Sequence, residues 1–96
     1  MLQLSVQSFK EQFLHQSHYL LVDVREPSET LLGVIPGAIL CPLGQISELD
    51  LGEFKSVVIY CKAGGRSMLA CQYLDQTTSG IELYNLEGGF DQFSHE

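Results

Sequence analysis

The residues with the clearest capacity for chemistry lie together in the segment Cys61–Arg66, which reads Cys-Lys-Ala-Gly-Gly-Arg. This segment follows the β-prone run Val57–Tyr60 and precedes a helical pattern that begins near Ser67. In a strand–loop–helix arrangement, the free backbone N–H groups at the helix N-terminus converge and favour a bound anion. Gly64 and Gly65 are both expected to supply backbone conformations that other residues resist, so that the chain can curl around a bound atom.

A cysteine placed at such a point is expected to be a nucleophile. Converging donors lower the pKa of a thiol, so Cys61 should be largely thiolate near neutral pH. Arg66 offers planar donors that can fork onto an oxyanion, and Lys62 adds a second charge. These are two of only five Lys and Arg residues in the chain. The other cysteines, Cys41 and Cys71, stand in apolar contexts and are interpreted as packing residues.

The surrounding pattern predicts the elements that position this loop. Strands are expected at Tyr19–Val24, Ala38–Cys41, Val57–Tyr60 and Ile81–Leu86, and helical segments at Ser5–Leu14, Pro27–Gly33, Pro42–Leu49 and from Ser67 onward. This alternation indicates an α/β fold with a doubly wound, largely parallel central sheet flanked by helices. Ligands of such sheets bind beyond the carboxyl ends of the strands, where Cys61 falls. With no repeat or linker in 96 residues, we expect a single domain spanning residues 1–96.

Composition excludes several classes of function. The net charge of −7 argues against binding to nucleic acid or to an anionic membrane surface. No apolar segment approaches the ~20 residues of a membrane span, and the first residues do not resemble a secretory signal. Three cysteines without a C-x-x-C pair make a disulfide framework or a zinc site unexpected, and they fit a reducing cytoplasm. His15, His18 and His95 lack partners at ligand spacing, so neither a metal nor a cofactor is expected.

Four segments, in order, resemble the rhodanese-type sulfurtransferases. Cys61-x-x-Gly64-x-Arg66-Ser67 is similar to the active loop of that family. Similar family segments correspond to Asp23–Glu26 (Asp-Val-Arg-Glu), Gly33–Ile39 (Gly-Val-Ile-Pro-Gly-Ala-Ile) and Leu86–Phe90 (Leu-Glu-Gly-Gly-Phe). Together they extend over nearly the whole chain, which therefore resembles a stand-alone rhodanese domain. Two departures are Val34, where the family usually has histidine, and phenylalanines such as Phe93 where tryptophans are common.

The resemblance implies the same doubly wound fold and a particular reaction. A small anionic donor such as thiosulfate would give its outer sulfur to Cys61, and the resulting persulfide would pass that sulfur to cyanide or a thiol. A sulfur-relay protein is a further candidate partner. The implied binding residues are those of the loop: Lys62, Ala63, Gly64, Gly65 and Arg66. Their N–H groups would stabilise the persulfide, while Arg66 and Lys62 would hold the oxyanion end of the donor.

Three further residues are expected to support the site. Asp23 and Arg25 stand at the end of an apolar strand, and we interpret them as a structural ion pair rather than as acid–base groups. Ser67 follows the loop directly and is grouped with them.

Two alternatives to sulfur transfer remain open from the sequence. Cysteine-dependent phosphatases and their arsenate reductase relatives place five residues between the cysteine and the arginine, whereas this chain has four, and the smaller loop suits a single sulfur better than a phosphate. Rhodanese-like domains also serve as non-enzymatic interaction modules. Such modules often lack the cysteine, however, and this chain keeps Cys61, Gly64 and Arg66.

Overall fold

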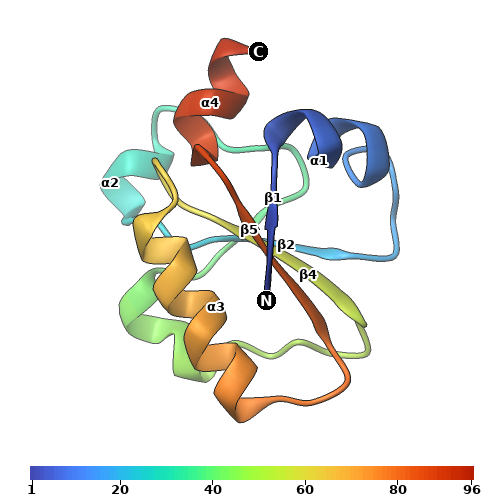
Figure 1. Ribbon diagram of the computed structural model, residues 1–96. Coiled ribbons are helices and arrows are strands. Elements are labelled where there is room, and N and C mark those ends of the chain that lie inside the picture. Colours follow the sequence, from blue (N-terminus) through green and yellow to red (C-terminus); the bar gives the residue numbers. More distant parts are fainter.

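An entirely parallel five-stranded β-sheet forms the centre of the molecule (Figure 1). The computed structural model describes residues 1–96. The strands are β1 (Leu2–Leu4), β2 (Leu20–Asp23), β3 (Ile39–Leu40), β4 (Ser56–Tyr60) and β5 (Glu82–Leu86), in the order β1-β5-β4-β2-β3. The predicted α/β fold with a doubly wound parallel sheet is therefore confirmed.

Helices connect the strands. They are α1 (Val6–Gln12), α2 (Pro27–Thr30), the 3-10 helix η1 (Leu43–Glu48), α3 (Gly65–Thr77) and α4 (Gly89–His95). The sequence leaves Ser5 and Ser8 open as the N-cap of α1; the cap is Ser5, whose side-chain oxygen accepts a hydrogen bond from the Ser8 N–H at 3.0 Å. Helix α2 has Pro27 at its first position, where the missing N–H costs nothing. None of these helices is long and apolar enough to cross a membrane.

Both faces of the sheet are covered, which explains why residues 57–60 of β4 are all apolar or aromatic. Val57 and Ile59 belong to the core cluster under α3 and η1, whereas Val58 and Tyr60 belong to the cluster under α1 and α4. All four side chains are fully buried. Each such side chain contributes about 1.5–3 kcal/mol through burial, so β4 anchors the sheet from both sides.

Two elements of the structure, β1 and α4, are not predicted from the sequence. Strand β1 has three residues, pairs in parallel with β5, and buries only Leu4, so it is too short to show an alternating pattern. Helix α4 begins at Gly89, after the N-cap Gly88, and both glycines have positive φ (56° and 78°). In the sequence, this glycine pair indicates only the end of the preceding strand. Helix α3 also begins at Gly65, two residues before the predicted start.

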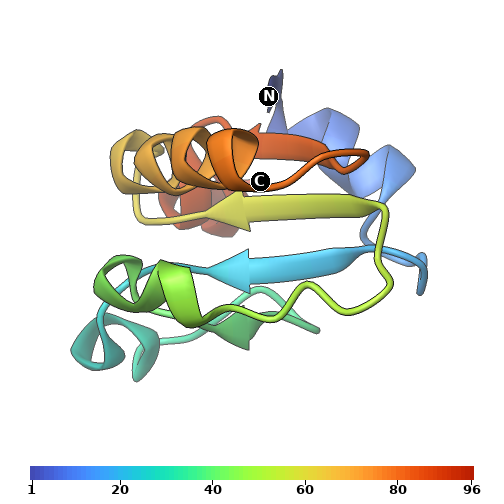
Figure 2. The ribbon, with the colours of Figure 1, turned by 90° about the horizontal axis from the view of Figure 1, so that it is seen from below.

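All strands run the same way, so their carboxyl ends share one edge of the sheet. Figure 2 shows the arrowheads of β2 and β4 pointing toward the edge where α2 and the start of α3 lie. Cys61 directly follows β4 and is therefore held at this edge, as expected.

Candidate active site

The loop Cys61–Arg66 surrounds the sulfur of Cys61 with donors. The Gly64 N–H donates to Cys61 Sγ at 3.1 Å, and the Ser67 hydroxyl oxygen lies 3.4 Å from the same sulfur. Gly64 has a φ of +115°, a conformation that requires glycine, as predicted. The same expectation for Gly65 is wrong: this residue lies in the first turn of α3 without positive φ, and an added Cβ there would meet nothing within 4 Å.

The surroundings of Cys61 favour its thiolate. Burial alone raises the pKa of the thiol, but hydrogen bonds from the Ser67 hydroxyl and from the N–H groups of Ser67, Gly64 and Ala63 outweigh burial and lower the pKa below its ordinary value. Burial raises the pKa of the Cys71 thiol to about 12 and also raises that of Cys41. Cys61 is thus the cysteine suited to nucleophilic attack, and the packing interpretation of the other two agrees with their environments.

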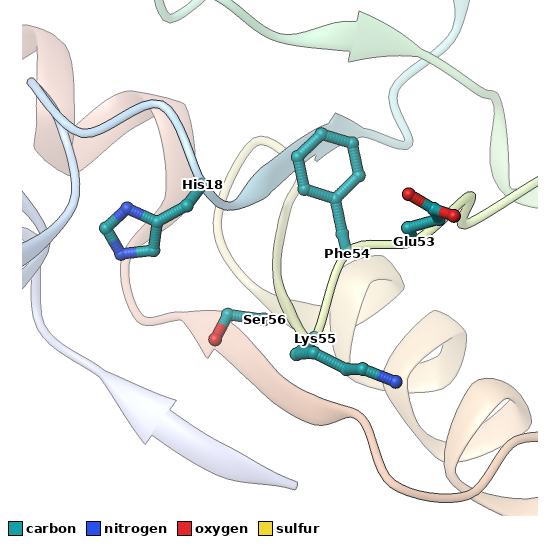
Figure 3. A pocket seen from close by; sticks show the side chains of 5 residues that line it. All are labelled: His18, Glu53, Phe54, Lys55 and Ser56. Carbon is teal, nitrogen blue, oxygen red and sulfur yellow. The ribbon is translucent and has the colours of Figure 1, made fainter.

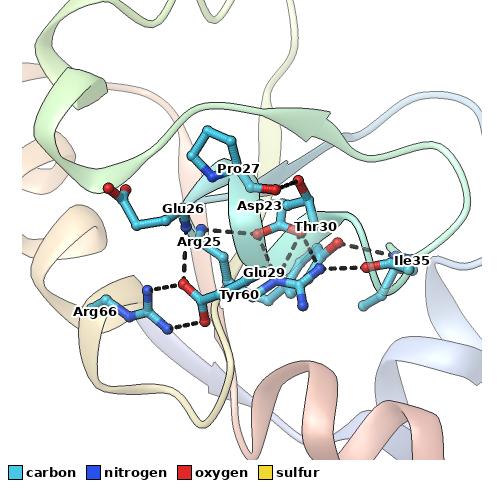
Figure 4. A network of polar contacts seen from close by, with 10 residues as sticks. Asp23, Arg25, Glu26, Pro27, Glu29, Thr30, Ile35, Tyr60 and Arg66 are labelled. Atoms are coloured by element: carbon cyan, nitrogen blue, oxygen red, sulfur yellow. Dashed lines mark hydrogen bonds and ion pairs between the residues drawn. The ribbon is translucent and has the colours of Figure 1, made fainter.

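The guanidinium of Arg66 is paired with a carboxylate that the sequence did not single out. Its Nη1 and Nη2 donate to Glu29 Oε1 and Oε2 at 2.6 and 2.8 Å, a bidentate pair at the rim of the site (Figure 4). This hydrogen bonding lowers the pKa of Glu29 to about 2 and raises that of Arg66. Glu29 lies in α2, 37 positions before Arg66, and no spacing rule connects the two.

Lys62 is also paired. Its Nζ lies 2.8 Å from Asp91 Oδ2 in α4, and this pairing raises the pKa of Lys62. The two cations of the loop, Lys62 and Arg66, therefore both have carboxylate partners from other elements. Binding of a sulfur donor by these two cations stays a prediction. A donor would compete with Glu29 for Arg66 and with Asp91 for Lys62.

The start of α4 holds the other side of the loop. The N–H groups of Phe90 and Asp91 donate to the carbonyls of Cys61 and Lys62 at 2.8 and 3.0 Å. A Cβ on Gly89 would collide with these same two carbonyls, so only glycine permits this close approach. Helix α4, which the sequence did not predict, thus fixes the backbone at Cys61 and Lys62.

Asp23 and Arg25 form the expected ion pair behind the site (Figure 4). Both are buried, and Arg25 Nη2 lies 2.8 Å from Asp23 Oδ2 and 2.7 Å from the Gly33 carbonyl. The guanidinium also lies over the Phe90 ring at 4.3 Å. The pair therefore clamps β2, the turn at Gly33 and α4 together, and neither side chain hydrogen-bonds to the loop.

Asn85 of β5 is a second residue that the sequence did not indicate. Its buried carboxamide contacts the Ser67 hydroxyl and donates to the Gly64 carbonyl at 3.3 Å. An asparagine inside an apolar strand pattern is only a weak indication of a site residue in the sequence. It does indicate that a buried amide needs hydrogen-bond partners.

The hollows of the surface differ in what they offer. The largest, about 590 Å³, lies near the amino end of β4 and contains no cysteine (Figure 3); its lining is His18, Glu53, Phe54, Lys55 and Ser56. A smaller one of about 180 Å³ lies beside the active loop and is lined in part by Glu29, Lys62 and Asp91. No group of three or more His, Cys, Asp or Glu side chains is arranged to hold a metal ion.

Comparison with known proteins agrees with this geometry. Residues 5–96 match the Rhodanese-like domain family, so the chain belongs to that family. It is 37% identical to the putative sulfurtransferase YtwF of Bacillus subtilis, covering 91% of this chain and 84% of the relative. It is 39% identical to a sulfurtransferase of Allochromatium vinosum, covering 86% and 78%. The crystal structure of a rhodanese-like domain protein from Staphylococcus aureus superposes with a TM-score of 0.80 at 31% identity, covering 97% of this chain and 91% of that one.

Proposed function

We propose that this protein is a sulfurtransferase that carries sulfane sulfur as a persulfide on Cys61. The observation that supports this most directly is the sulfur of Cys61, set at the end of β4 among the donors of Gly64 and Ser67. These donors favour a thiolate, which is the form that attacks sulfur. The relatives named as sulfurtransferases support the same class of reaction.

The proposed donor is a small anion such as thiosulfate. The Cys61 thiolate attacks the outer sulfur of the donor and forms a new S–S bond. The bond between the outer and inner sulfurs breaks, and sulfite leaves with the electron pair. Arg66 and Lys62 hold the oxyanion end of the donor during the attack, and after sulfite leaves the persulfide anion lies among the N–H groups that stabilised the thiolate.

The acceptor completes the cycle. Cyanide attacks the terminal sulfur, leaves as thiocyanate, and returns Cys61 to its thiolate form; a thiol acceptor, free or on a sulfur-relay protein, leaves as a new persulfide. The three cysteines are all free, which fits a reducing compartment such as the cytoplasm.

Intact-mass measurement after incubation with thiosulfate tests the proposal. One added sulfur, about 32 Da, is expected on the wild-type protein and on Cys71→Ser, but not on Cys61→Ser. Cyanide should remove the added mass with release of thiocyanate. Retention of the adduct and of turnover in Cys61→Ser would overturn the assignment.

An aryl phosphate assay on the same samples addresses the phosphatase alternative. A phosphate monoester needs donors around three equatorial oxygens, with the nucleophile in line behind phosphorus. The four residues between Cys61 and Arg66 should bring the N–H groups too close to the sulfur to admit that group. Hydrolysis that depends on Cys61, without persulfide, would make the phosphatase assignment the better one. Absence of both activities would favour an interaction module.

A further inference from the structure

A series of polar contacts connects Cys61 through Ser67 and Asn85 of β5 to Gln3 of the neighbouring strand β1. The Ser67 hydroxyl oxygen lies 3.4 Å from Cys61 Sγ, 3.1 Å from the Gly64 carbonyl, and in contact with Asn85 Oδ1. Asn85 Nδ2 in turn donates to Gln3 Oε1 at 3.0 Å and to the Gly64 carbonyl at 3.3 Å. Ser67 and Asn85 are 0% and 2% exposed, so solvent has little access to the contact between them, although Asn85 and Gly64 also line a surface hollow of about 450 Å³ together with Gln3.

The orientation of the Asn85 carboxamide follows from its neighbours. The Gly64 carbonyl can only accept a hydrogen bond, so it must face the NH₂ group of Asn85. The carboxamide oxygen therefore faces Ser67. No buried side-chain N or O atom lacks a partner in this arrangement.

The Ser67 hydroxyl has one proton and three neighbouring acceptors: the Cys61 sulfur, the Gly64 carbonyl and Asn85 Oδ1. While Cys61 is a thiol, its S–H can donate to Ser67, and Ser67 can donate to Asn85. When the thiol loses its proton to solvent, the sulfur can only accept, and Ser67 must turn its proton toward it. Asn85 Oδ1 then loses its donor inside the protein, which is unfavourable.

We propose that Asn85 is a positioning residue for Cys61 that acts through Ser67. Its carboxamide oxygen competes with the sulfur for the Ser67 hydroxyl proton and so limits how far negative charge on the sulfur is stabilised. For the thiolate, the proposal needs only the contacts of Cys61 itself. Its application to the persulfide rests on the proposed function. The competition has a chemical use, because a sulfur that is too well stabilised ionises readily but attacks slowly.

The charged groups around Cys61 stay the same when Asn85 is changed to an uncharged residue. They are Arg66 and Lys62 of the loop, Glu29 of α2, Asp91 of α4, and the buried pair Asp23 and Arg25 behind the site. A change in the ionisation of Cys61 in an Asn85 variant therefore reports on the polar contacts.

Titration of the thiolate by its ultraviolet absorbance tests the proposal without any sulfur donor, and Cys61→Ser supplies the blank. Asn85→Leu, similar in volume but without an acceptor, and Asn85→Ala should raise the thiolate fraction at a fixed pH below the midpoint by roughly three- to tenfold, the effect of one stronger hydrogen bond to a charge. Asn85→Asp keeps an acceptor and adds negative charge, so it should lower that fraction. Gln3→Ala, which removes only the partner of Nδ2, should leave it unchanged.

Repetition in a Ser67→Ala background decides whether the effect passes through Ser67. With the hydroxyl absent, Asn85→Leu and Asn85→Ala should no longer change the thiolate fraction. An unchanged or lower fraction in both single variants, or an equal rise with and without Ser67, would overturn the proposal. If the apolar variants do not fold, the Asn85→Asp effect should shrink in the Ser67→Ala background to the part that its added charge exerts through space, and an effect of equal size in the two backgrounds contradicts the proposal. Because no donor is used, failure here differs from failure of persulfide formation in the wild type.

Discussion

At the scale of single residues, the active loop combines a favoured thiolate with cations that already have partners. The N–H of Gly64 and the hydroxyl of Ser67 supply Cys61 with donors, whereas Arg66 and Lys62 are held by Glu29 and Asp91. If an anionic donor binds these cations as proposed, it competes with a carboxylate for each of them.

The Arg66–Glu29 pair gives two substitutions with opposite expected effects on sulfur transfer. If Arg66 binds the donor, Arg66→Ala should lower kcat/KM for thiosulfate at least tenfold, the loss of about 1.5–3 kcal/mol for a charge-assisted hydrogen bond. Glu29→Gln removes the competing carboxylate, so it should raise kcat/KM about two- to fivefold, chiefly through KM. Steady-state kinetics with varied thiosulfate measures both. Equal losses in the two variants would give the pair a purely structural role.

The same ion pair predicts a pH dependence of stability. Pairing with Arg66 lowers the pKa of Glu29 to about 2, below its unfolded value near 4.3, so its contribution is present above the unfolded value and is lost as pH falls toward 2. Both side chains are partly exposed (35% and 28%), so solvent limits this contribution to about 0.5–1 kcal/mol.

Urea unfolding of Glu29→Gln against the wild type, repeated across acid pH, measures this contribution. The difference should be present near neutral pH and should fade between about pH 4.5 and 2. Asp91→Asn is the matched control, because the Lys62–Asp91 pair is more exposed and should contribute less. A Glu29→Gln difference that does not change with pH would rule out the ion pair as its source.

At the scale of elements, two glycines that are adjacent in the sequence differ in backbone conformation and in their contacts with Cys61. Gly64, with φ of +115°, turns its N–H toward Cys61, whereas Gly65 is an ordinary residue of the first turn of α3. Gly64→Ala should cost at least about 1–2 kcal/mol of stability and reduce persulfide formation, because the strained backbone moves the donor away. Gly65→Ala, the control, should be neutral or slightly stabilising. Thermal unfolding and intact mass compare them; equal losses in both variants would mean that this turn conformation is not what matters.

The sequence predicts the elements whose pattern is local and misses those that depend on distant partners. The apolar runs of β2 and β4, and Gly64 three residues after Cys61, are visible in a short window of sequence. Strand β1 is not, because it is defined by pairing with β5 at the other end of the chain. Helix α4 is not, because its start depends on close approach to the carbonyls of Cys61 and Lys62.

Site residues follow the same rule. Cys61 and Gly64 are visible in the sequence because anion-binding loop chemistry requires a cysteine and a glycine at this spacing. Glu29, Asp91 and Asn85 contact the loop across gaps of 18 or more positions, and no pattern of charge or polarity in the sequence marks them as partners. The candidate nucleophile is thus visible in the sequence, whereas the side chains that contact Arg66, Lys62 and Ser67 from other elements are not.

At the scale of the whole molecule, an acidic body surrounds a site proposed to bind an anion. The net charge is −7, and the molecule measures 33 × 28 × 20 Å. At an ionic strength of about 0.01 M the Debye length is about 30 Å, so an approaching anion responds to all of these charges. At about 0.15 M the Debye length falls to about 8 Å, so only the charges of the loop and its immediate neighbours act on the approaching anion.

Salt should therefore accelerate sulfur transfer from thiosulfate. Long-range repulsion between an acidic protein and a dianion is screened first, whereas the loop cations Lys62 and Arg66, already paired with carboxylates, lose little by screening. The second-order rate of persulfide formation, followed by intact mass at low donor concentration, should rise by roughly two- to fivefold between about 0.01 M and 0.15 M ionic strength. An uncharged organic trisulfide is the matched control, and its rate should change little. A rate for thiosulfate that falls with salt would show that the cations of the loop attract the donor more strongly than the acidic surface repels it, and that their carboxylate partners do not neutralise them.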